Sequence, residues 1–157
     1  MKKQKNLEKE IEKNIEKSVE KSLHRFRKIG YIAIIIFNII LLYVFNNLLN
    51  WHISFLKESF AAVLWLINVS IISTIAFNLL YIFYDQNWFK NFLEILLNLV
   101  SLLIFYSFYK IFPFQFSGQG NDMAKIVLII FIILVVIVII VNIIKFVYNI
   151  LGFPKNK

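Results

Sequence analysis

The sequence has 157 residues, of which 60% are hydrophobic and only 17% are charged, with a formal net charge of +8. A soluble domain ordinarily has about 25% charged residues, so this composition speaks against one. The absence of cysteine excludes disulfides, thiol nucleophiles, Cys-ligated zinc and iron–sulfur clusters. The length allows one structural unit. We therefore expect a small integral membrane protein.

Residues 1–29 form the first predicted element, a charged amphipathic helix. Residues 1–28 contain ten Lys and Arg and five Glu. No Pro or Gly interrupts them before Gly30, so the helix is expected to continue into the first apolar segment. Apolar residues recur every four positions and form a slanting stripe, because each step of four drifts about 40° around a helix. These residues are Leu7, Ile11, Ile15, Val19 and Leu23.

Three interpretations of this helix are open at this stage. It is a solvated helix, a helix that lies on the membrane surface, or one helix of a bundle formed by several copies. Cations near its end are expected to contact anionic lipid headgroups: Lys21, Arg25, Arg27 and Lys28. Nucleic-acid binding is not expected, because Glu alternates with Lys along the helix.

Four long apolar segments follow, at about residues 31–49, 60–83, 89–112 and 126–148. A helix needs about 20 mostly apolar residues to cross a bilayer, and unpaired backbone groups in lipid are costly. The segments are too long and too uniform for barrel strands. Asp122 is expected to cap the start of the last helix. The predicted fold is all-α: a four-helix up-down membrane bundle over residues 30–151, with a tail at 152–157.

The distribution of positive charge predicts the orientation of the chain. If the N-terminus is inside, the inner segments have fourteen Lys and Arg and the outer segments three. The positive-inside rule then places both termini in the cytoplasm of a multi-pass protein of the cell membrane. The abundance of Lys, Asn and Ile is typical of a bacterial sequence.

Polar residues inside the apolar segments are the candidate site. Charged groups in lipid normally face the interior of a bundle and pair with one another. We expect a polar cluster in the inner half of the membrane, in which Lys145 is the partner of Glu94. Its members are Asn38, Asn78, Glu94, Asn98, Asn142 and Lys145.

This cluster has two interpretations. In the functional one, Glu94 handles protons or cations. In the structural one, the amides join helices through hydrogen bonds, while Glu94 and Lys145 extend toward the aqueous interface. The sequence leaves both open.

No catalytic constellation, metal site or cofactor motif is present in the sequence, so an enzyme is not expected. The favoured function is a non-enzymatic structural or interaction subunit that associates with itself or with another membrane protein. The alternative is a small oligomeric ion channel or pore. It would resemble holins in size and charged tail, with a path lined by Ser, Thr and Asn residues and by Glu94.

Overall fold

The computed structural model describes the backbone of residues 2–151 and the side chains of Gln4 and of residues 11–151. This part of the chain is helical apart from its connectors. The helices are α1 (Lys2–Asn47), the short 3₁₀ helix η1 (Glu58–Phe60), α2 (Ala61–Phe83), α3 (Asn87–Ile111) and α4 (Gly120–Ile150). Each of the four α-helices contains a segment that is long and apolar enough to cross a membrane.

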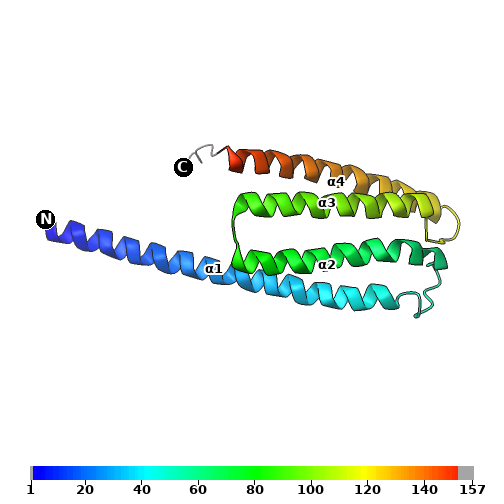
Figure 1. Ribbon diagram of the computed structural model, residues 1–157, viewed down its shortest axis with the longest axis horizontal. Helices are drawn as coiled ribbons and strands as arrows, with labels where there is room; N and C mark the ends of the chain where they lie inside the picture. The colour runs from blue at the N-terminus through cyan, green and yellow to red at the C-terminus, as the bar shows by residue number, and fades with distance from the viewer. Residues whose placement is uncertain (1, 152–157) are drawn as a thin grey trace.

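The helices pack in chain order as an open row. Contacts between α3 and α4 are the most extensive, those between α1 and α2 come next, and those between α2 and α3 are fewest. Helices α1 and α4 do not pack along one another, so the row is not closed into a ring. The connectors lie at alternating ends, and α1 projects far beyond the other helices (Figure 1). We call residues 2–26 of α1 the extension, and the end of the row from which it projects the extension end.

The apolar core lies toward the opposite end of the row. Phe60, Ile67 and Ile71 are buried there, against apolar residues of α1 and α3. The Phe60 ring stacks on the Phe108 ring at a centroid distance of 6.2 Å. Because Phe60 immediately precedes α2, this contact anchors the start of α2 to α3.

Two connectors meet beside this core. The Lys57 amide donates to the Pro113 carbonyl at 2.9 Å, and the Gln115 amide donates to the Phe55 carbonyl at 2.8 Å. Buried backbone groups require such partners. The connector between α1 and α2 is thereby joined to the one between α3 and α4.

The four predicted segments coincide with the observed helices, with differences at their ends. Helix α1 runs unbroken through Gly30, and α4 begins at Gly120, six residues before the predicted apolar segment. The expected cap at Asp122 is wrong: Gln119 occupies the N-cap position without a side-chain hydrogen bond, and Asp122 lies in the first turn. A carboxylate there still interacts favourably with the helix dipole.

Candidate functional site

A cluster of charged and aromatic side chains lies at the extension end of the row. Its centre is Asp85, in the connector between α2 and α3, and its other members are Arg27, Tyr31, Tyr81 and Lys90. An Arg27 guanidinium nitrogen lies 3.0 Å from the Asp85 carboxylate, and the Lys90 ammonium forms a second ion pair with it. The Tyr31 hydroxyl donates to Asp85 Oδ1 at 2.8 Å. This group, the Asp85 cluster, joins α1 to α3 through the connector.

Two tyrosine rings surround the Lys90 ammonium. Its nitrogen lies 5.3 Å from the Tyr31 ring centroid and 5.9 Å from that of Tyr81. The rings are themselves 5.5 Å apart. A cation near the faces of aromatic rings is attracted by their quadrupoles. Three helices therefore converge on one cation, with Tyr31 on α1, Tyr81 on α2 and Lys90 on α3.

The Asp85 carboxyl is held in its charged form. Burial by itself raises the pKa of this group, but hydrogen bonds from Lys90 and Tyr31 and the charges of Lys90 and Arg27 outweigh burial. The pKa of Asp85 consequently lies below its ordinary value. Its side chain is only 15% exposed, whereas that of Arg27 is 51% exposed. The cluster thus covers the Asp85 carboxylate where α1 faces the connector, while half of the Arg27 side chain stays exposed.

Sequence reasoning did not identify the Asp85 cluster. It assigned Asp85 to a connector and Arg27 to lipid contact, and 54 residues separate Tyr31 from Asp85. One signal was present: Arg27 and Tyr31 are four residues apart and therefore share a helix face. Asp85 is the one acidic residue in the connector between α2 and α3, and it was therefore a candidate partner for Arg27.

A reciprocal amide pair between α1 and α2 was also missed. The Asn46 amide nitrogen donates to Asn68 Oδ1 at 2.9 Å, and that of Asn68 donates to Asn46 Oδ1 at 3.0 Å. Two such bonds between the same side chains fix the register of the two helices. Each amide is otherwise costly in an apolar environment.

The amides of the predicted polar cluster bond mainly within their own helices. The Asn38 side chain donates to the Ile34 carbonyl and that of Asn78 to the Thr74 carbonyl, each at 2.8 Å. Asn98 donates to the Glu94 carbonyl at 2.7 Å. Asn38, Asn78 and Asn142 are buried between helices. Bonds to the carbonyl four residues earlier satisfy the donors where a polar group would otherwise be unpaired.

The two charged members of the predicted cluster are exposed. Among the described side chains, the only two ion pairs are those at Asp85, so neither Glu94 nor Lys145 forms an ion pair with the other or with any other side chain that the structure describes. Both side chains lie on the surface of α3 and α4. The structure thus places three of the amides between helices, leaves Asn98 half-buried and leaves the two charges outside.

The cations expected to contact lipid lie around the end of the extension. Lys21, Arg25 and Arg27 are exposed, and Lys28 is half-buried. Arg27 differs from the others, because Asp85 is its partner. Phosphate contact by the remaining three stays a prediction.

The extension presents the apolar stripe without a covering element. The four stripe residues with described side chains are between 50% and 57% exposed: Ile11, Ile15, Val19 and Leu23. The side chain of Leu7, the first residue of the predicted stripe, and the predicted tail at 152–157 lie outside what the structure describes.

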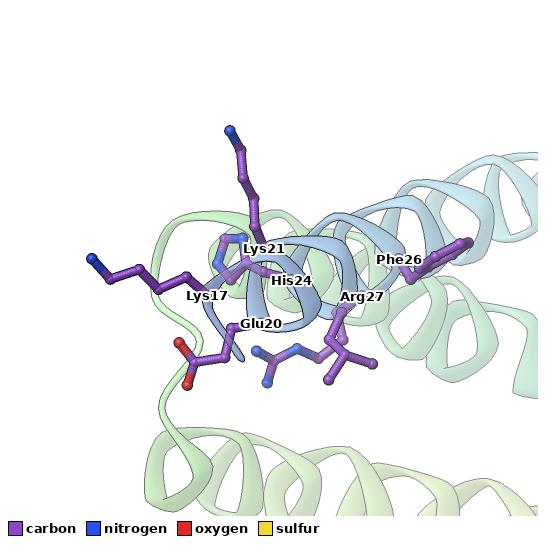
Figure 2. Close-up of a pocket in the computed structure, with 7 residues that line it drawn as sticks. Lys17, Glu20, Lys21, His24, Phe26 and Arg27 are labelled. Atoms are coloured by element: carbon purple, nitrogen blue, oxygen red, sulfur yellow. The ribbon is translucent and has the colours of Figure 1, made fainter. Parts of the chain in front are cut away.

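An open hollow of about 1030 Å³ lies beside the last turns of the extension. Figure 2 shows that Lys17 and Lys21 point away from the rest of the chain there, while Glu20 and Arg27 lie on another side of α1. Every lining residue belongs to α1. A single helix cannot enclose a small molecule, so this hollow is an open surface and not a ligand pocket.

No protein-family model, curated protein or solved structure matches the chain.

Proposed function

We propose that the chain is a non-enzymatic multi-pass membrane protein that acts as a structural or interaction subunit. It would cross the membrane four times in up-down order, with both termini in the cytoplasm, and associate with further copies or with another membrane protein. The observation that carries the proposal is the projecting extension with its uncovered apolar stripe (Figure 1). An apolar stripe flanked by polar residues is typical of a helix that packs against a partner.

The continuity of α1 favours packing over membrane binding for the extension. An unbroken helix that crosses a bilayer continues away from it and cannot also lie flat on its surface. Helix α1 is unbroken from Lys2 to Asn47, and Arg27 and Tyr31 tie it to the connector where it leaves the row. The extension would therefore project into the cytoplasm, while Lys21, Arg25 and Lys28 contact anionic headgroups at its base.

The geometry of the stripe suits a crossing contact. Residues at a spacing of four form one of the ridges used in helix packing, and two such ridges interdigitate at about −50°. Ile15 and Val19 lie at the middle of the stripe. A crossing of this kind brings the same two residues of two copies together, in line with self-association.

Cysteine cross-linking tests this proposal cleanly, because the chain contains no cysteine. In native membranes we expect Val19→Cys to be cross-linked efficiently to a second copy or to a partner of different mass. Lys17→Cys is the matched control, since residue 17 is exposed on the opposite face of the same helix. Equal and negligible cross-linking at both positions, together with a monomer in native membranes, would contradict the proposal.

A small oligomeric pore is the second candidate, and exposed Glu94 on a membrane-spanning helix favours it. Ionisable residues in such helices often mark ion paths. If the pore exists, Glu94→Gln should lower cation or proton flux into vesicles severalfold relative to the unmodified chain. Glu58→Gln, in the connector before α2, should leave flux unchanged. Equal flux in the Glu94 variant and the unmodified chain would remove this candidate.

A further inference from the structure

Helix α3 has two different exposed faces. One is apolar from Phe92 to Leu103 and suits contact with lipid, with Lys110 following on the same side in the last turn; its apolar and aromatic residues are Phe92, Leu96, Leu99, Leu103 and Tyr106, each between 38% and 54% exposed. The other includes exposed Glu94 and half-buried Asn98 and Ser101, at spacings of four and seven that keep them on one side of the helix. We call this second side the Glu94 face.

Lys145 on α4 belongs to the same side of the α3–α4 pair. Phe105 lies eleven residues after Glu94, close to three helical turns, and therefore shares its side of α3. The Phe105 ring stacks on the Phe131 ring, with a centroid distance of 5.3 Å and an angle of 5° between the ring planes. Lys145 lies fourteen residues after Phe131, close to four turns, and so shares that side of α4.

The two charges also lie at similar depth along the two helices. The ring contacts 92–146 and 105–131 make α3 and α4 antiparallel. The ring centroids of Phe92 and Phe146 are 5.8 Å apart, so these two residues lie at about the same height along the helix pair. Glu94 is two residues beyond Phe92 and Lys145 one residue before Phe146, so both are displaced in the same direction and differ by about 1.5 Å. Counted from the more distant contact between Phe105 and Phe131, they differ by about 4.5 Å. One face thus presents an acid and a base side by side, exposed and unpaired with each other.

We infer that this face is an interface with a second copy of the chain, in which Glu94 of each copy pairs with Lys145 of the other. A twofold axis along the membrane normal preserves depth and sets α3 of one copy opposite α4 of the other. That operation brings two charges that do not pair with each other within one chain into two ion pairs per dimer. Charges in lipid are costly unless they pair, whereas the apolar face needs no protein partner. The inference rests on the proposed self-association and names a second surface for it.

Charge exchange between two chains tests the interface. Glu94→Lys leaves two cations on the face and Lys145→Glu leaves two acids, so each variant by itself should dimerise at least about tenfold more weakly. A mixture of the two variants in one membrane should restore dimerisation, because every cation then faces an acid. The readout is energy transfer between differently labelled chains in vesicles, with Lys125→Glu, outside this face, as the matched control.

The outcomes separate this inference from the proposed function. Recovery in the mixture requires pairing between chains, since each variant chain carries only one sign of charge at the two positions. Failure of the mixture to recover, while the combined variant in a single chain does, would mean pairing within one chain and would overturn the inference. Dimers that ignore every charge change, while Val19→Cys still cross-links, would also overturn it and leave the proposed self-association standing. Absence of both energy transfer between chains and Val19→Cys cross-linking would contradict the inference and the proposed self-association together.

Discussion

Replacing Asp85 by Asn is expected to lower the free energy of unfolding by about 2–3 kcal/mol, because it removes the single anion between two cations. Lys90, with a side chain that is only 17% exposed, would keep its charge beside two tyrosine rings without a carboxylate. Arg27 would lose its partner on the connector. The loss should be measured by titration with a denaturing detergent in mixed micelles.

The matched control for this variant is Asp122→Asn, since Asp122 is exposed in the first turn of α4. Its effect should stay below about 0.5 kcal/mol. Tyr31→Phe removes one hydrogen bond to the carboxylate and should fall between the two, at about 1 kcal/mol. Equal stability of the Asp85 and Asp122 variants would mean that the cluster does not hold α1 to the connector.

The pH dependence supplies an independent check of the same cluster. The pKa of Asp85 is lower in the folded chain than its ordinary value, so the charged form stabilises the fold at pH values above that ordinary value. This stabilisation is lost as the pH falls below about 4 and through the lower folded pKa. The unmodified chain should therefore lose more stability on acidification than Asp85→Asn, which has no proton to bind at this position.

Phe60→Ala is expected to have the other large effect, a loss of about 3 kcal/mol in the free energy of unfolding. Phe60 is 2% exposed, and its ring stacks on that of Phe108. Removal of the ring leaves a cavity beside Phe108, and the packing contacts that line it are lost. The same detergent titration measures the loss.

Phe83→Ala is the matched control, because Phe83 lies at the other end of α2 and is 86% exposed. It makes the same chemical change with little loss of packing within the chain. A leucine at position 60 fills part of the cavity and should recover more than half of the loss. Comparable destabilisation by the alanine variants at 60 and 83 would be inconsistent with a core at that end of the row.

Length and local composition were sufficient to predict the four helices. Each apolar segment is too long for a strand, and a segment able to cross a membrane pairs its backbone groups within one helix, so neighbouring residues alone decide the element. The unbroken continuation of α1 through Gly30 also followed from local pattern, since no other breaker interrupts the segment. Exact helix ends were less certain, as the wrong cap at Asp122 illustrates, because several polar residues there compete for the cap position.

The partners of individual side chains did not follow from the pattern. Asn38 and Asn78 were expected to meet other polar residues, and they instead donate to carbonyls of their own helices. The sequence placed Asp85 only in a connector, and its ion pair with Arg27 depends on the position of α1 along α2. A shift of one residue along a helix rotates a side chain by about 100°, so such contacts depend on register.

The amino-acid sequence by itself therefore determined that this protein is helical, has four segments able to cross a membrane and has a long charged helix ahead of the first of them. These properties depend on residues close together in the chain. Only the tertiary structure decided that the helices form an open row, that Asp85 joins α1 to α3, and that Glu94 and Lys145 stay exposed on one face. Those features depend on the packing and register of helices far apart in the sequence, to which many contacts contribute at once.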